Sequence, residues 1–184
     1  ETTKNLGKVA PDWTMGISNT LRYRNLSLSF LIDVRYGGVM YSGTVSDLRV
    51  NGMAEETIGK NRTDIVDKGV KQDGTENTTA ITPYQFWSNN YSSKVSEANV
   101  FDATFVKLRE MVLSYQMPQR WFKNCFIGSL ALGVEGRNLW LMKSNVPHID
   151  PETNIFGPSA VGSGVEYSAI PTTRSWGFNI KLTF

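Results

Sequence analysis

The chain has 184 residues and a formal net charge of +2, from 19 basic and 17 acidic side chains. This near balance gives no electrostatic footprint of a nucleic-acid-binding protein, so we expect no nucleic acid partner. The single cysteine excludes an internal disulfide bond and a multi-cysteine zinc site. No run of residues approaches the ~18 consecutive apolar positions of a membrane-spanning helix, which excludes a helical membrane protein.

The start of the chain lacks the marks of a signal peptide. Residues 1–8 contain neither a basic start nor an apolar stretch. We therefore expect either that such a segment has been removed or that the sequence belongs to a longer chain.

Two alternating segments follow. Residues 13–24 carry apolar side chains at odd positions, and residues 26–36 carry them at even positions. A period of two predicts β-strands. Because only a tight break at Arg24 and Asn25 separates the two runs, we expect an antiparallel hairpin.

The alternation is lost over residues 37–103, which are rich in Gly, Asn, Thr, Asp and Lys. We expect one very long loop there, with local turns. Most connections in compact domains have ~4 to 6 residues, so a loop of this length indicates a functional or partner-covered segment.

The second half of the chain returns to strands. Residues 104–117 read as a strand whose apolar positions change face, so we expect a β-bulge near Glu110. Residues 119–127 suit a short helical turn, and residues 129–141 alternate again. A second Gly/Pro/Ser-rich loop is expected over residues 142–171, followed by a last strand over residues 172–184.

Aromatic residues mark the two ends of several predicted strands. The same-face pairs are Trp13 with Tyr23, Trp176 with Phe184 and, if the bulge is ignored or absorbed, Phe105 with Tyr115. Ten residues of strand tilted by ~40° span about 25 Å, the height of the apolar band of an outer-membrane barrel with its aromatic girdles. The connections also alternate between short and long, as in such barrels. The predicted fold class is all-β, an antiparallel transmembrane β-barrel segment with long extracellular loops.

The predicted strands are too few to close a barrel. Bacterial barrels of this type contain an even number of at least ~8 strands. An open sheet would leave unpaired backbone groups in hydrocarbon, where each costs several kcal/mol. We therefore expect the chain to be the end of a larger barrel.

Short motifs in a fixed order resemble the C-terminal barrel portion of the SusC/RagA family of TonB-dependent outer-membrane transporters. The resemblance covers nearly the whole chain except the interior of the 37–103 loop. Its motifs are Pro11–Thr14, Leu28–Ser29, Ile32–Gly38, Ala103–Glu110, Leu113–Tyr115 with Pro118, Gly136–Leu139, Asp150–Glu152 and Arg174–Phe184.

The resemblance implies that residues 1–184 supply the last five strands of a barrel of about 22 strands in a Gram-negative outer membrane. It implies a plug, energy from the TonB complex, and import of oligosaccharides or peptides beneath a SusD-like surface lipoprotein. The plug, the TonB-binding segment and the remainder of the barrel would lie outside this sequence. Residues 1–12, 37–103 and 142–171 would face outward, where they would meet the lipoprotein lid or the cargo.

Three groups of residues are candidates for functional contacts. Four aromatics of the long loop are candidates for ligand or lid contact, although such residues more often pack the loop itself: Tyr84, Phe86, Trp87 and Tyr91. Six charged residues are predicted to face the barrel lumen, as expected of any wet barrel interior: Arg22, Asp33, Arg35, Glu135, Arg137 and Lys181. The last strand resembles the C-terminal signal read by the barrel assembly machinery, and it equally suits a lipid-facing strand: Trp176, Phe178, Ile180, Leu182 and Phe184.

No catalytic constellation is apparent, so we expect no enzyme activity, no cofactor and no metal site. His148, near Asp150 and Glu152, is expected to be solvated or to serve the turn between two prolines. Cys125 is expected to be a buried, inert thiol in the connection before residue 129.

Two other interpretations remain open at this stage. The aromatics would instead form a sugar platform if the chain were a soluble all-β carbohydrate-binding module. A small complete barrel would require at least three further strands within residues 37–103, where no ten-residue alternation is seen.

Overall fold

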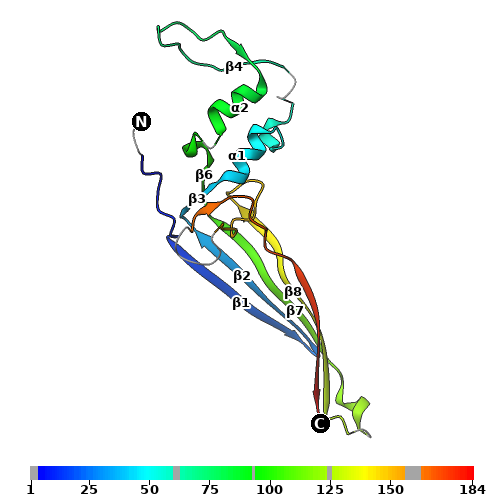
Figure 1. The fold of residues 1–184 in the computed structure, drawn as a ribbon. Helices are drawn as coiled ribbons and strands as arrows, with labels where there is room; N and C mark the ends of the chain where they lie inside the picture. Colours follow the sequence, from blue (N-terminus) through cyan, green and yellow to red (C-terminus); the bar gives the residue numbers. More distant parts are fainter. Residues whose placement is uncertain (1–3, 60–62, 93, 124–125, 156–162) are drawn as a thin grey trace. The chain divides into compact units, whose positions relative to one another are not determined.

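The computed structural model describes residues 4–59, 63–92, 94–123, 126–155 and 163–184. The chain divides into two compact units, which are described separately (Figure 1). The sheet unit contains residues 11–37, 103–145 and 172–184, and the loop unit contains residues 1–10, 38–102 and 146–171.

The sheet unit is one antiparallel sheet of five strands in the order β1-β2-β7-β8-β10. The strands are β1 (Trp13–Tyr23), β2 (Leu26–Tyr36), β7 (Phe105–Gln116), β8 (Ser129–Ser144) and β10 (Ser175–Thr183). The prediction of a first hairpin is confirmed, since Tyr23 pairs with Leu26 across the two-residue turn. Strand β8 runs three residues further than the predicted end at 141, and β10 begins at 175 instead of 172.

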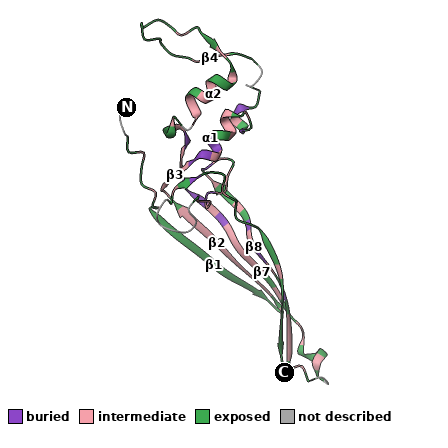
Figure 2. Ribbon diagram, in the orientation of Figure 1, coloured by how far each residue is buried: buried purple, intermediate pink, exposed green. Residues whose placement is uncertain are grey.

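The register gathers apolar side chains on one face of this sheet, named here the apolar face. Trp13 pairs with Tyr36, and Leu21 pairs with Leu28. The same face continues across the sheet. Leu28 also pairs with Leu113, Leu113 pairs with Val134, and Val134 pairs with Phe178. Many of these side chains are exposed, and Figure 2 shows β1 exposed along its length. Within its own unit, therefore, this face is left uncovered.

The predicted bulge is confirmed, and its position corrects one aromatic pair. Leu31 pairs with Glu110 and Ile32 pairs with Leu108, so Arg109 is the extra residue. One extra residue reverses the facing of everything beyond it. The proposed same-face pair of Phe105 and Tyr115 is therefore wrong.

The bulge restores a continuous apolar face along β7. It brings Val106 and Leu108 to the side that carries Met111, whereas Phe105 turns to the opposite side beside Arg35. Phe105 is almost fully buried, unlike the exposed aromatics of the apolar face.

The loop unit contains regular elements, whereas the sequence predicted only a long loop with local turns. These elements are β3 (Val39–Ser42), α1 (Gly43–Val50), η1 (Glu55–Thr57), β4 (Ile65–Val66), β5 (Ala80–Ile81), α2 (Pro83–Tyr91), η2 (Ser96–Asn99), β6 (Val100–Asp102) and β9 (Val165–Glu166). Strand β3 pairs with β6 and, in parallel, with β9 from the second predicted loop.

Local capping explains why helices form in this polar stretch. The Ser42 hydroxyl accepts a hydrogen bond from the Val45 backbone N–H at 3.1 Å at the start of α1. Thr82 and Gln85 form a reciprocal capping box at the start of α2, where Pro83 occupies the first turn. These caps satisfy backbone donors that a helix end otherwise leaves unpaired.

Among the described residues, no helix has the length and apolarity needed to cross a membrane. The short helical turn expected after Pro118 is present as η3 (Gln119–Phe122). Cys125 lies outside the described residues.

Candidate functional site

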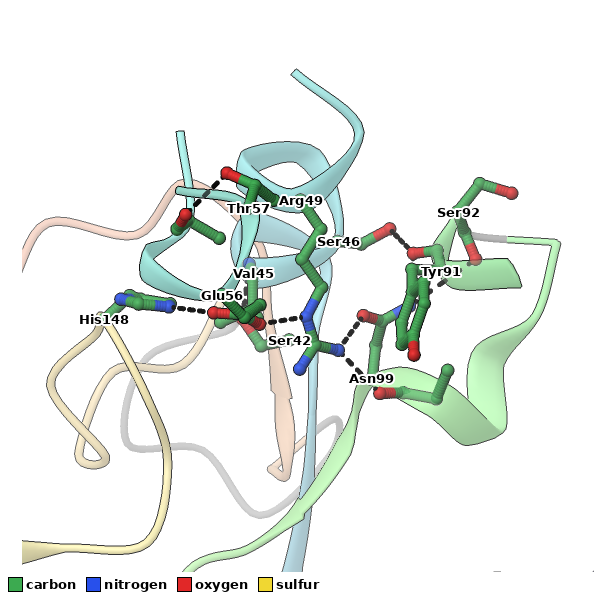
Figure 3. A network of polar contacts seen from close by, with 12 residues as sticks. Ser42, Val45, Ser46, Arg49, Glu56, Thr57, Tyr91, Ser92, Asn99 and His148 are labelled. Atoms are coloured by element: carbon green, nitrogen blue, oxygen red, sulfur yellow. Dashed lines mark hydrogen bonds and ion pairs between the residues drawn. The ribbon is translucent and has the colours of Figure 1, made fainter. Parts of the chain in front are cut away.

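Arg49 of α1 stands at the centre of a polar network in the loop unit (Figure 3). Its Nε donates to Glu56 Oε1 at 2.6 Å. Its Nη1 donates to the Ala98 carbonyl at 2.8 Å and to Asn99 Oδ1 at 3.1 Å. The guanidinium is mostly buried and thereby joins α1, η1 and η2.

Two aromatic rings flank the same guanidinium. Its central carbon lies 5.1 Å from the ring centroid of Tyr91 and 5.2 Å from that of Phe101. These distances suit cation–π attraction, which strengthens when the cation is desolvated. The ring of Tyr91 therefore packs against Arg49 within the loop unit.

His148 extends the network to the second predicted loop. Its Nε2 lies 2.9 Å from Glu56 Oε2 (Figure 3). Burial by itself would raise the pKa of Glu56, but hydrogen bonds from His148 and Arg49 outweigh it and lower the pKa to about 2. Glu56 is therefore an ionised carboxylate at neutral pH.

His148 is exposed, in keeping with the expectation that it is solvated, and its imidazole also contacts Glu56. Its backbone has φ of +65°, which agrees with the turn role that was the other expectation. Among the described residues, no group of three or more His, Cys, Asp or Glu side chains is arranged to hold a metal ion.

A buried carboxylate fixes the segment after β9 to α1. Glu166 accepts hydrogen bonds from the hydroxyls of Ser42 and Thr44, both at 2.6 Å, and from the Ala169 backbone N–H at 3.2 Å. The Tyr167 hydroxyl donates to Asp47 at 2.8 Å. That hydrogen bond and the negative charge of Asp47 raise the pKa of Tyr167.

Three of the four candidate aromatics of the long loop pack against one another. Phe86 meets Trp87 edge to face at 5.3 Å, and Trp87 lies 4.8 Å from Tyr91 between ring centroids. Trp87 is buried, whereas Tyr84 is exposed. The contact role of all four stays a prediction, and Tyr84 alone offers a largely free ring.

Tyr84 borders a hollow of about 350 Å³ between the end of α1 and the start of α2. Its lining consists of Val50, Asn51, Gly52, Thr82, Pro83, Tyr84 and Trp87. Backbone, amide and hydroxyl groups beside two aromatic rings can bind a polar ligand or a partner side chain.

The six predicted lumen residues lie on the face of the sheet opposite the apolar face. Asp33 pairs with Lys107, Arg137 pairs with Glu110, and Lys181 pairs with Ala131. Arg22, Arg35 and Glu135 share this polar face by the same register. That they face a lumen stays a prediction.

Ion pairs concentrate on the polar face near the bulge. Arg109 pairs with Asp33 and donates to Asn138 Oδ1 at 3.1 Å. Arg137 lies 3.7 Å from Glu110 and 4.0 Å from Glu135. Asn138 has φ of +50° and coincides with a register shift in β8 opposite the bulge.

The residues of the predicted assembly signal continue the apolar face along β10. Trp176, Phe178, Ile180 and Leu182 pair with positions on the apolar side of β8. The ring of Phe184 stacks on Phe126 at 5.7 Å with an interplanar angle of 3°. A role in assembly stays a prediction.

Sequence reasoning missed Arg49, Glu56 and Glu166, which organise the loop unit. Their partners lie far away in sequence: Arg49 and Asn99 are 50 residues apart, and Ser42 and Glu166 are 124 apart. The available signals were the capping residues Ser42 and Thr82, which predict helix starts but not these long-range partners.

The chain matches two relatives along nearly its full length. It is 25% identical over 185 residues to the TonB-dependent receptor P3 of Formosa agariphila, which covers 98% of this chain. It is 26% identical over 182 residues to the TonB-dependent receptor P26 of the same organism, which covers 97%. The chain resembles a part of a TonB-dependent receptor. It spans only 17% and 18% of the length of these two relatives, and no protein-family model matches it.

Solved structures of the RagAB peptide importer share its fold. The open-open state matches with a TM-score of 0.64 and 20% identity over 96% of this chain and 17% of that chain. A second structure, of the RagAB peptide transporter, matches with a TM-score of 0.63 at the same identity and coverage. The predicted resemblance and the predicted fold class, part of an antiparallel barrel, are confirmed.

Proposed function

We propose that this chain contributes wall strands and outer loops to a TonB-dependent transporter that imports a nutrient, an oligosaccharide or a peptide, across a Gram-negative outer membrane. The observation that carries the proposal is the uncovered apolar face of the five-stranded sheet. Similarity to TonB-dependent receptors over nearly the whole chain supports it. In this role the chain conducts cargo and catalyses no reaction.

The apolar face suits contact with lipid. Its exposed side chains include Trp13, Leu21, Leu113, Trp176 and Phe178, on strands of 9 to 16 residues. A soluble protein rarely exposes so large an apolar surface, whereas a barrel wall presents alternate residues to hydrocarbon. The two edge strands, β1 and β10, would pair with the remainder of the barrel, because unpaired backbone groups are costly in lipid.

The soluble carbohydrate-binding module is the weaker alternative. A sandwich buries the apolar face of each sheet against a second sheet of similar size. The other sheets in the described residues contain three and two short strands. The apolar surface of the five-stranded sheet therefore favours the membrane role.

The loop unit would face outward and contact the cargo or a SusD-like surface lipoprotein. The exposed ring of Tyr84 beside its hollow is the surface best suited to this contact. Energy would come from the TonB complex through the plug region, outside these residues. The charged polar face would line the path of the cargo.

Deletion of the gene that encodes the intact receptor tests transport directly. The parent strain and the deletion strain are grown with defined peptides or with defined oligosaccharides as the limiting nutrient. The proposal predicts lost growth on one of these classes and recovery when the receptor is restored. Undiminished uptake of both classes would contradict it.

A second test addresses the outward contact of Tyr84. We expect Tyr84→Ala in the intact receptor to reduce cargo uptake or co-purification of the surface lipoprotein, because it removes an exposed ring from the hollow. Val70→Ala, another exposed apolar position of the loop unit, is the control. Identical uptake and lipoprotein recovery in both variants would remove Tyr84 from the contact surface.

A further inference from the structure

The two short connections of the sheet unit lie at one end of the sheet, together with Phe184. The first is the turn at Arg24 and Asn25, and the second contains η3. The Gly128 backbone N–H donates to the Thr183 carbonyl at 2.7 Å, which places the end of β10 beside the second connection. Figure 1 shows η3 and the C-terminus at this end of the sheet.

The charged side chains at this end of the sheet are all cationic. The segments around the two connections, residues 14–32, 111–134 and 175–184, contain no aspartate or glutamate. Their cationic residues are Arg22, Arg24, Arg120, Lys123 and Lys181. Arg24, Arg120 and Lys123 belong to the connections and are exposed. None of these three forms an ion pair with another residue that the structure describes.

Exposed aromatic rings accompany the cations in both connections. The Arg24 guanidinium carbon lies 5.3 Å from the ring centroid of Tyr23, which is 69% exposed at the edge of the apolar face. In the second connection Trp121 is 60% exposed, and the stacked rings of Phe126 and Phe184 are 77% and 79% exposed.

A hollow of about 610 Å³ joins cations and rings in the second connection. It is lined by Gln119, Arg120, Phe122, Lys123, Phe126, Ile127, Gly128 and Phe184. Apolar rings beside cationic groups match the chemistry of a phospholipid at a membrane surface. The rings suit its acyl chains, and the cations suit its phosphate.

We propose that this end of the sheet is an anchor for anionic phospholipids, in which Arg24, Arg120 and Lys123 bind headgroup phosphates while Tyr23, Trp121, Phe126 and Phe184 rest at the interface. The inference builds on the proposed function, because it requires the apolar face to lie in lipid. Tyr23 lies on that face by register, and its position together with the purely cationic side chains selects a lipid surface as the occupant. Arg22 and Lys181 lie on the polar face by register and take no part.

Native mass spectrometry of the intact receptor in mild detergent tests the anchor. The receptor is incubated at low salt with equal amounts of phosphatidylglycerol and phosphatidylethanolamine, and the retained molecules of each lipid are counted. We expect phosphatidylglycerol to be retained preferentially. Each removed cation should lower this preference about fivefold, the usual effect of one basic residue at an anionic surface.

Two variants probe the two connections independently. Arg120→Gln with Lys123→Gln removes the cations of the second connection. Arg24→Asn removes the cation of the first and suits its φ of +53°, because asparagine tolerates the left-handed region. Lys68→Gln with Lys71→Gln removes two exposed cations of the loop unit and should leave the preference unchanged.

The outcomes separate this inference from the proposed function. Equal retention of the two lipids by the wild-type receptor, or an unchanged preference in both anchor variants, would overturn the anchor while leaving a membrane transporter intact. Release of the lipid by millimolar inorganic phosphate would also overturn it, in favour of a phosphate site. Recovery of the receptor in a soluble fraction would overturn both proposals.

Discussion

At the scale of single residues, Glu56 links two segments of the loop unit. It joins the buried guanidinium of Arg49 to His148, and these partners lower its pKa from the ordinary 4.5 to about 2. A lowered pKa means that the carboxylate stabilises the fold fully above about pH 4.5. This contribution is lost as the pH falls from there through about 2.

We therefore expect Glu56→Gln to destabilise the loop unit at neutral pH by about 1.5–3 kcal/mol, the usual effect of losing a hydrogen bond to a charged group. Hydrogen exchange of residues 43–58 in the intact receptor, corrected for intrinsic rates, measures the change. Wild-type protection should fall between pH 4.5 and pH 2, and the variant should lack this dependence. Glu55→Gln, its exposed neighbour in η1, is the control, and equal exchange in both variants would refute the role of Glu56.

Gly43 is required because Tyr167 lies against its backbone. A Cβ at this position would lie 2.0 Å from Tyr167 Cδ2, so the ring would have to move. We expect Gly43→Ala to cost about 1–3 kcal/mol by overpacking and to release the 165–169 segment. Faster hydrogen exchange there would show the release. Gly69→Ala meets no atom within 4 Å and serves as control; matching exchange profiles would contradict this prediction.

At the scale of elements, the bulge at Arg109 sets which side chains of β7 lie on the apolar face. Deleting Arg109 should move Val106 and Leu108 to the polar side, because a one-residue shift reverses every side chain beyond it. We expect little folded receptor, measured as the heat-modifiable band on a semi-native gel. Arg109→Ala keeps the bulge but loses a partly exposed ion pair with Asp33, worth about 1 kcal/mol or less, and the hydrogen bond to Asn138. Equal folded yields for the two variants would argue against the bulge.

The strands were predictable from the sequence because a period of two survives wherever one face is apolar. The bulge was predictable from the break in that period. The faces occupied by Phe105 and Tyr115 were not, because one inserted residue moves every side chain beyond it to the other face. Helices α1 and α2 were missed because their polar sequences carry little apolar periodicity. Their caps at Ser42 and Thr82 are local signals, whereas the contacts of Arg49 with Asn99 join distant segments.

At the scale of the whole molecule, the predicted assembly role of the last strand is open to a direct test. Phe184 stacks on Phe126 and closes the row of apolar side chains along β10. We expect deletion of Phe184 from the intact receptor to lower its level in the outer membrane severalfold, if the strand is read during assembly. Deletion of one residue from the exposed 68–71 stretch of the loop unit is the control. Unchanged outer-membrane levels would refute the assembly role.

The central claim is that this chain is a part of a larger outer-membrane barrel, and the mass and location of the native polypeptide test it most directly. An antibody against residues 63–81 is used on denaturing gels of soluble, inner-membrane and outer-membrane fractions. We predict an outer-membrane band far above the 20.6 kDa of the chain. A soluble band near 20.6 kDa would contradict the account and favour a soluble binding module.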